Sequence, residues 1–137
     1  MAGGIDQTRA TVILQALAIN SATATVGTNT ITGPIHMRLF TANGTDAATG
    51  TELATSGGYT AGGSALSFAA AATGSVATNA AVSWTNMPST TLTGMEEWDT
   101  SATPLRLFWA PWTAGSIVVA SGNTFTVASG SLTNSLA

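Results

Sequence analysis

Residues Ile35-His-Met-Arg-Leu-Phe40 decide the fold class of this chain. Along this stretch the apolar Ile, Met and Leu alternate one by one with His, Arg and Phe. Successive side chains of a β-strand point to opposite faces, so strict alternation is typical of a strand with one face on a hydrophobic core. The stretch therefore predicts a half-buried β-strand.

The same two-residue period returns several times further along the chain. Turn sequences such as Asn43-Gly44, Gly57-Gly58 and Ser121-Gly122-Asn123 separate the alternating segments. No helical segment lies between them, so parallel strands joined by helices are not expected. Many short strands at close spacing predict an all-β fold, either an antiparallel β-sandwich or a jelly-roll-like barrel, over residues 34–137. The alternating segments are residues 66–70, 76–84, 105–110, 117–119 and 125–127.

The N-terminal part of the chain has a different pattern. A short helix is predicted from Asp6 to about Asn20, because an aspartate can cap a helix and apolar side chains, including Ile13 and Leu17, share one face. The next residues, 21–33, are mostly Ala, Thr, Asn and Gly without a helical period, which predicts a loop or an extended arm that reaches a neighbouring subunit. The expected organisation is an N-terminal helix and arm, residues 1–33, and a β-sandwich domain, residues 34–137, in one folding unit.

The composition of the 137 residues excludes several classes of function. Only 7% of them are charged, against roughly 25% in average soluble domains, and there is no lysine. The net charge of −3 and three scattered arginines argue against nucleic-acid binding, which needs clustered basic residues. No run approaches the ~20 apolar residues of a membrane span. The sequence starts without the basic and apolar parts of a secretory signal, so we expect the protein to stay in the cytoplasm until assembly.

Metal-ligating and catalytic side chains are scarce. There is no cysteine, and the one histidine, His36, lies in a predicted strand, where a surface or hydrogen-bonded role is expected. Asp46 and Glu52 could share a calcium ion with backbone carbonyls, but their spacing does not match a calcium-binding helix–loop–helix. Without lysine there is no phosphate-binding loop of the usual kind, and no Gly-x-Ser-x-Gly turn joins a strand to a helix. We expect neither a metal nor a cofactor.

The segment Glu96-Glu97-Trp98-Asp99 is a cluster of acidic residues. In a strand, Glu97 and Asp99 would share a face, which suggests the paired carboxylates of glycosidases. Such pairs usually come from distant segments and lie among aromatic side chains that stack on sugars. A solvated strand end is therefore the favoured interpretation, and the chain is not expected to be an enzyme.

Aromatic residues concentrate in the C-terminal half, at Trp84, Trp98 and residues 108–112. Adjacent Phe108 and Trp109 would point to opposite faces of a strand, one inward and one outward. We interpret the cluster as part core and part subunit interface, with a carbohydrate-binding platform as the alternative. The predicted interface residues are Ile13, Leu17, Tyr59, Trp98, Phe108 and Trp112.

Residues 39–59, Leu-Phe-Thr-Ala-Asn-Gly-Thr-Asp-Ala-Ala-Thr-Gly-Thr-Glu-Leu-Ala-Thr-Ser-Gly-Gly-Tyr, carry a resemblance to a known family. The segment resembles small β-rich virion proteins of tailed bacteriophages, especially phages of actinobacteria. The shared pattern is an N-terminal helix, a strand ending in Leu-Phe-Thr, a loop with Gly50-Thr51-Glu52, and then Gly57-Gly58-Tyr59. Residues 121–132 are similar to that family's final strands. Two departures are the Thr-Ala-Gly-Gly-Ser that follows Tyr59 and the two tryptophans of residues 105–112, more than the resemblance leads us to expect.

The resemblance implies a function in assembly. Members of the family are labelled minor capsid (decoration) proteins or tail-fibre-like proteins. A decoration protein would act in the virion, bind the major capsid protein and stabilise the shell, and it would be a homo-oligomer, with a trimer suited to a lattice axis. A tail-fibre or tail-tip module that binds a host surface glycan is the alternative. The family has no catalytic residues that could be carried over.

Overall fold

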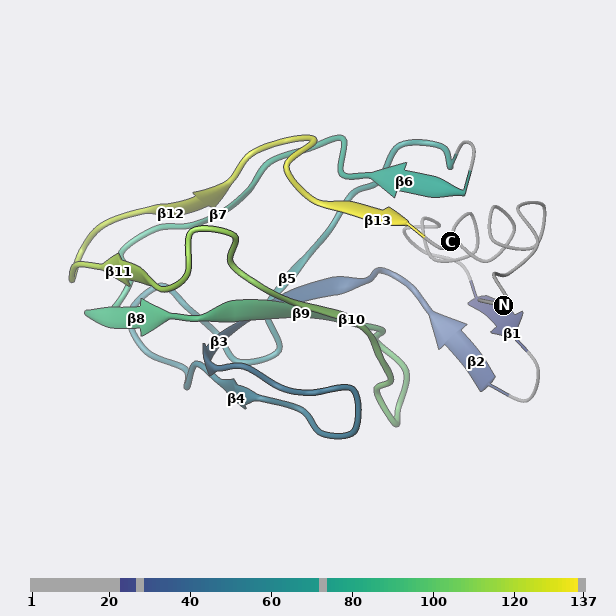
Figure 1. Ribbon diagram of the computed structural model, residues 1–137, viewed down its shortest axis with the longest axis horizontal. Coiled ribbons are helices and arrows are strands. Elements are labelled where there is room, and N and C mark those ends of the chain that lie inside the picture. The colour runs from purple at the N-terminus through teal and green to yellow at the C-terminus, as the bar shows by residue number, and fades with distance from the viewer. Residues whose placement is uncertain (1–22, 27–28, 72–73, 136–137) are drawn as a thin grey trace, which may run out of the picture.

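A computed structural model describes residues 23–26, 29–71 and 74–135 of the chain (Figure 1). The described part is all-β, with every strand pair antiparallel, and has a β-sandwich-like architecture, as the alternation predicted. It contains no helix. The helix predicted from Asp6 to about Asn20 lies outside the described residues, so it stays a prediction.

The largest sheet has five strands in the order β10-β9-β3-β4, with β5 also pairing with β3. The central strands are β3 (His36–Ala42) and β9 (Gly94–Trp98), and β10 (Arg106–Pro111) lies at one edge. The short strands β4 (Thr51–Glu52) and β5 (Ser64–Ala65) share the outer edge of β3. This sheet therefore joins segments from both halves of the chain.

Three two-stranded ribbons complete the body of the fold. Figure 1 shows two of them, β7 with β12 and β6 with β13, along one side of the large sheet, while β4 and the loop before it lie on the other side. The ribbons are β6 (Ser75–Ala77) with β13 (Thr133–Ser135), β7 (Val82–Trp84) with β12 (Phe125–Val127), and β8 (Thr90–Leu92) with β11 (Ile117–Val119).

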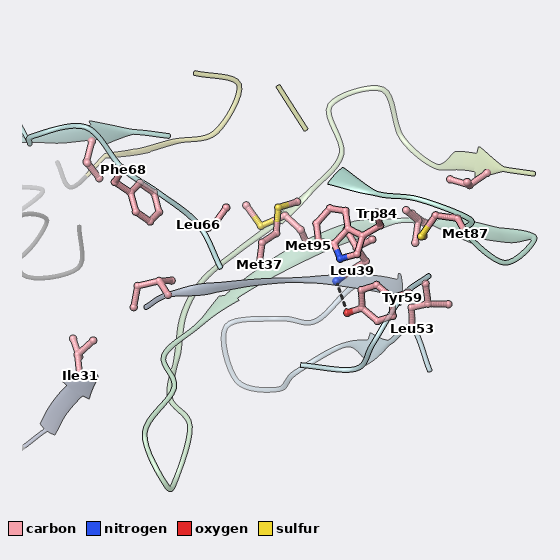
Figure 2. Packing of buried hydrophobic residues seen from close by; sticks show 14 of the residues in the cluster. Ile31, Met37, Leu39, Leu53, Tyr59, Leu66, Phe68, Trp84, Met87 and Met95 are labelled. Atoms are coloured by element: carbon pink, nitrogen blue, oxygen red, sulfur yellow. Dashed lines mark hydrogen bonds between the residues drawn. The ribbon is translucent and has the colours of Figure 1, made fainter. Parts of the chain in front are cut away.

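The register of β3 against β9 sorts the side chains of the sheet into two faces. Met37 lies opposite Glu97 and Leu39 lies opposite Met95. Both Met37 and Leu39 are fully buried, which confirms the predicted alternation. Arg38, between them, is on the other face because strand side chains alternate. The core fills the space between the large sheet and the ribbons, and Figure 2 shows among its members Met37, Leu39, Leu66, Phe68, Trp84, Met87 and Met95.

Residues 76–84 form two strands where one continuous strand was predicted. β6 ends at Ala77 and β7 begins at Val82. Between them, Asn79 donates its backbone N–H to Ser67 O (2.9 Å) and its side-chain amide to Phe68 O (3.1 Å). These bonds pair Asn79 with the segment of Ser67 and Phe68 and not with β12 or β13, so the chain passes from one ribbon to the other at this point.

The segment predicted as a loop or arm contains a strand pair. β1 (Thr23–Val26) and β2 (Asn29–Thr32) are antiparallel, with threonine opposite threonine at two positions. Threonine is a good strand former. The end of β2 is held by the body, because the Thr32 N–H donates to Asp99 Oδ2 (3.1 Å) and Ile31 is buried in the core. Contact of the arm with a neighbouring subunit stays a prediction.

Candidate functional site: the long loop and the polar face

The long loop, residues 43–63, connects β3 to β5 and includes β4. It is attached to the sheet through a gap in the ladder at the outer edge of β3. β4 pairs with one end of β3 and β5 pairs with the other, which leaves Leu39 between them. The Leu39 N–H donates to the hydroxyl of Tyr59 (3.1 Å), so a side chain takes the place of a strand at this point (Figure 2). A buried backbone N–H without a partner would cost free energy, and Tyr59 supplies the partner.

The Glu52 carboxylate accepts hydrogen bonds from three donors, two in this loop and one in β3. Its Oε1 accepts the Tyr59 hydroxyl (2.8 Å) and the Gly62 N–H (2.6 Å), and its Oε2 lies 3.4 Å from the Arg38 guanidinium. Burial raises the pKa of Tyr59 well above its ordinary value, with the bond from Leu39 opposing the shift and Glu52 adding to it. Tyr59 therefore remains a neutral hydroxyl that donates to Glu52 and accepts from Leu39.

The side of the large sheet that faces away from the core carries a network of charged and aromatic side chains. The Arg38 guanidinium lies 4.6 Å from the centre of the Trp98 ring, a cation–π contact. The Trp98 indole donates to Glu96 Oε2 (2.9 Å), and Arg106 forms an ion pair with Glu96 Oε1 (3.1 Å). We call Arg38, Glu96, Trp98, Arg106 and Trp109 the polar face.

Arg106 fastens the tip of the long loop to the polar face. Its guanidinium donates to three backbone carbonyls of one turn, Thr45 O (2.6 Å), Asp46 O (3.1 Å) and Ala48 O (2.8 Å). The Trp109 indole donates to the Asp46 carboxylate (2.8 Å). The loop is thus held on its own chain by β10.

Two glycines let the loop approach the sheet this closely. The Gly50 N–H donates to Glu96 Oε1 (3.0 Å), and a Cβ on Gly50 would collide with the Ala42 carbonyl and the Phe40 ring. A Cβ on Gly44 would lie 2.6 Å from Glu96 Oε1. Any larger residue would push the turn away from Glu96, so glycine is required by close approach here.

The acidic cluster is buried, and the prediction of a solvated strand end was wrong. Glu96, Glu97 and Asp99 are each 1% exposed. Glu96 and Glu97 belong to β9, which has a strand on each side, the ribbons over one face and the long loop over the other. Asp99 Oδ1 accepts the Leu105 N–H (2.7 Å), so it closes the connection between β9 and β10. Glu96 and Glu97 thus lie on opposite faces of β9, and each of the three carboxylates accepts a donor from its own chain.

The predicted interface residues are dispersed. Tyr59 has no exposed surface and offers nothing to a partner, because it fills the edge of β3. Trp98 belongs to the polar face, while Phe108 and Trp112 are half-buried against the core. Ile13 and Leu17 lie outside the described residues. A role of Trp98, Phe108 or Trp112 in a subunit interface stays a prediction.

Four aromatic rings form a row through the core. Tyr59 lies 6.2 Å from Trp84, Trp84 lies 6.0 Å from Phe125, and Phe125 lies 5.7 Å from Trp112, all measured between ring centres. The row links the long loop to β7, β12 and the segment after β10. Trp84 is buried, as expected for a core tryptophan.

The described residues hold no cluster of three or more His, Asp or Glu side chains that could bind a metal ion. Asp46 and Glu52, the pair considered for calcium, bind different donors. His36 Nδ1 lies 3.0 Å from Gly62 O, in agreement with the predicted hydrogen-bonded role. No helix in the described ranges has the length and hydropathy of a membrane span. Comparison of the chain with family models, curated proteins and solved structures finds no match.

Substitution of Tyr59 by phenylalanine tests the attachment of the loop. The change keeps the ring but leaves the buried Leu39 N–H and one Glu52 lone pair without their partner, so we expect a loss of about 1–3 kcal/mol in the free energy of unfolding. Urea denaturation followed by circular dichroism measures it. As a control, Ser83→Ala removes an exposed hydroxyl bond to Thr126 and should change stability by less than about 0.5 kcal/mol. Equal effects of the two changes would contradict the role of Tyr59.

Proposed function

We propose that this protein is a non-enzymatic structural component of a virus particle, a decoration or minor capsid protein that binds the major capsid protein and stabilises the shell. The observation that carries the proposal is that the few charged side chains of the described residues are mostly buried or paired within the chain. Among the described residues, the acids Glu96, Glu97 and Asp99 are buried and both arginines are in ion pairs. Little free charge therefore remains on the described surface.

A surface of this kind favours packing against other protein copies. Net charge keeps soluble proteins apart, and proteins with little charge associate more readily. The exposed residues of the described strands and turns are mostly Thr, Ser, Ala, Gly and Asn. Such small side chains lose little rotamer entropy when an interface forms. A building block that is present in many copies can use a modest interface, because the contacts are repeated over the whole assembly.

The residues behind the resemblance to phage virion proteins have defined positions in the fold. Gly50, Glu52 and Tyr59 attach the long loop to the sheet through hydrogen bonds of their own. The shared pattern thus contains the residues that attach this loop to the sheet, which supports the proposal of a common fold with that family. Binding to a capsid is proposed from the resemblance alone.

A tail-tip module that binds a glycan is the second candidate, favoured by the tryptophans of the polar face. Trp98 and Trp109 are both partly exposed and have charged residues beside them. Their indole N–H groups, however, already donate to Glu96 and Asp46, and Arg38 lies over the Trp98 ring. One face of the Trp98 ring is thus covered by Arg38 and is not free to stack on a sugar, so the structural role in the shell is preferred.

Electron microscopy with a gold-labelled antibody against this chain tests the proposal. Particles purified from a lysate of the source cells should carry label over their heads, and quantitative mass spectrometry should find many copies per particle relative to the major capsid protein. Label confined to the tail with few copies would favour the glycan-binding alternative. Particles without the chain would refute both proposals.

A further inference from the structure

Glu97 is a buried carboxyl on the core face of the large sheet. It lies in β9 between Met37 of β3 and Phe108 of β10 and is 1% exposed. Its Oε2 accepts the side-chain amide of Asn134 (2.7 Å), whereas Oε1 is buried and has no hydrogen-bond partner among the described residues. The carboxyl is therefore half-satisfied, and its neighbours on both adjacent strands, Met37 and Phe108, are apolar.

Asn134 connects this carboxyl to β13, the last strand of the described chain. It is the central residue of β13, is 6% exposed, and lies opposite Val76 of β6. Its neighbours Thr133 and Ser135 are exposed, so Asn134 is the residue of β13 that points inward. The Glu97–Asn134 bond consequently joins the β6–β13 ribbon to the large sheet across the core.

No described cation faces the Glu97 carboxyl. β3 contributes Met37, β10 contributes Phe108, and β13 contributes Asn134. Arg38 and Arg106 lie on the polar face, on the other side of the sheet, where they pair with Glu52 and Glu96.

The two nearest acids in the sequence, Glu96 and Asp99, are bound to other donors. Glu96 pairs with Arg106, and Asp99 accepts the Leu105 N–H. Desolvation therefore dominates at Glu97. Burial raises its pKa from 4.5 to about 7, and the bond from Asn134 opposes the shift.

We propose that the burial of Glu97 between the large sheet and β13 is a pH-dependent latch: β13 stays on the large sheet when the Glu97 carboxyl is neutral and is released when it is ionised. An ionised carboxylate in this position needs water or further donors, which it gains when β13 moves away. With β13 on the large sheet, the neutral Glu97 contributes its full stability below the pH at which a glutamate in water ionises. That stability falls as the pH rises from about 4.5 towards 7, and it is lost at higher pH. The latch does not depend on the proposed function.

Hydrogen exchange of the full chain, measured at pH 5.5 and pH 8 and corrected for the chemical exchange rate, tests the latch. In the wild-type protein, protection of the β13 amides should fall roughly tenfold or more at pH 8. In Glu97→Gln, which keeps the shape and cannot ionise, protection should be similar at the two pH values. Unchanged protection of wild-type β13 would overturn the proposal, and this comparison does not need the variant.

Two other outcomes would also overturn it. An equal loss of protection in β12 (Phe125–Val127) would mean that the whole fold opens and not one strand. A Glu97→Gln protein that loses β13 protection at pH 8 as much as the wild type would show that another group is responsible. Selective loss at β13 in the wild type alone would support the latch.

Discussion

Replacement of Arg106 by alanine should lower the free energy of unfolding by about 3–5 kcal/mol, the cost of leaving a buried charge without its partner. The Arg106 side chain is 14% exposed and that of Glu96 is 2% exposed, so solvent screens this pair weakly. The change would also remove the donor to three carbonyls of the loop, at Thr45, Asp46 and Ala48. The loop tip should then separate from the sheet.

Urea denaturation followed by tryptophan fluorescence measures the loss, and Arg38→Ala is a matched control. Arg38 also forms an ion pair on the polar face, but both partners are about a fifth exposed and lie 3.4 Å apart. Its loss should cost about 1 kcal/mol, typical of a partly exposed pair with a cation–π contact. In Arg106→Ala, a second change, Glu96→Gln, should recover part of the stability because it removes the unpaired charge. Similar losses for Arg106→Ala and Arg38→Ala would contradict this account.

The strands of the fold could be predicted because alternation is a local property. Residues 35–40 alone predicted β3, and burial of Met37 and Leu39 confirms it. The predicted strand boundaries were wrong where the hydrogen bonds of one side chain compete with the alternation. Residues 76–84 alternate throughout, yet the strand is interrupted where the side chain of Asn79 donates to Phe68 O. A period of two indicates which residues share a face, but it does not show where a strand ends.

The polar face could not be predicted, because it depends on which strands are neighbours. Glu96 is buried only because β10 brings Arg106 beside it and the long loop covers it. Nothing local to Glu96-Glu97 distinguishes such a position from a solvated strand end. One signal was present: in a chain with 7% charged residues, Arg38 and Arg106 stand inside alternating strands. Isolated arginines at such positions indicate buried acids, since a buried carboxylate requires a partner.

The role of Tyr59 was missed for a related reason. A single tyrosine after two glycines suggests an exposed turn, and we expected an interface residue there. Its hydroxyl instead completes the hydrogen bonds of β3 between two short partner strands. Tyr59 lies at this edge because the chain leaves β3, passes through the long loop and returns to the same edge of β3 at β5. The loop is therefore part of the fold, and a partner would meet its outer side.

Replacement of Gly63 by alanine should cost more than about 4 kcal/mol, an exceptional loss for one methyl group. Gly63 has a φ of +71°, and its added Cβ would overlap the Met37 carbonyl and approach Arg38 Cα to 3.0 Å. Both atoms belong to the backbone of β3, which cannot move without breaking its ladders to β5 and β9. A domain with a typical stability of about 5–15 kcal/mol would then be close to unfolding.

The adjacent Gly62 provides the control for this prediction. It has a φ of +100°, but a Cβ there would meet nothing within 4 Å. Gly62→Ala should therefore cost only the backbone strain, roughly 1–2 kcal/mol. Thermal and urea denaturation of the two variants separate backbone strain from collision, because both residues lie in the same turn. Equal stability of the two variants would mean that β3 yields to the added methyl group, and that the close approach of the long loop to its edge does not constrain the fold.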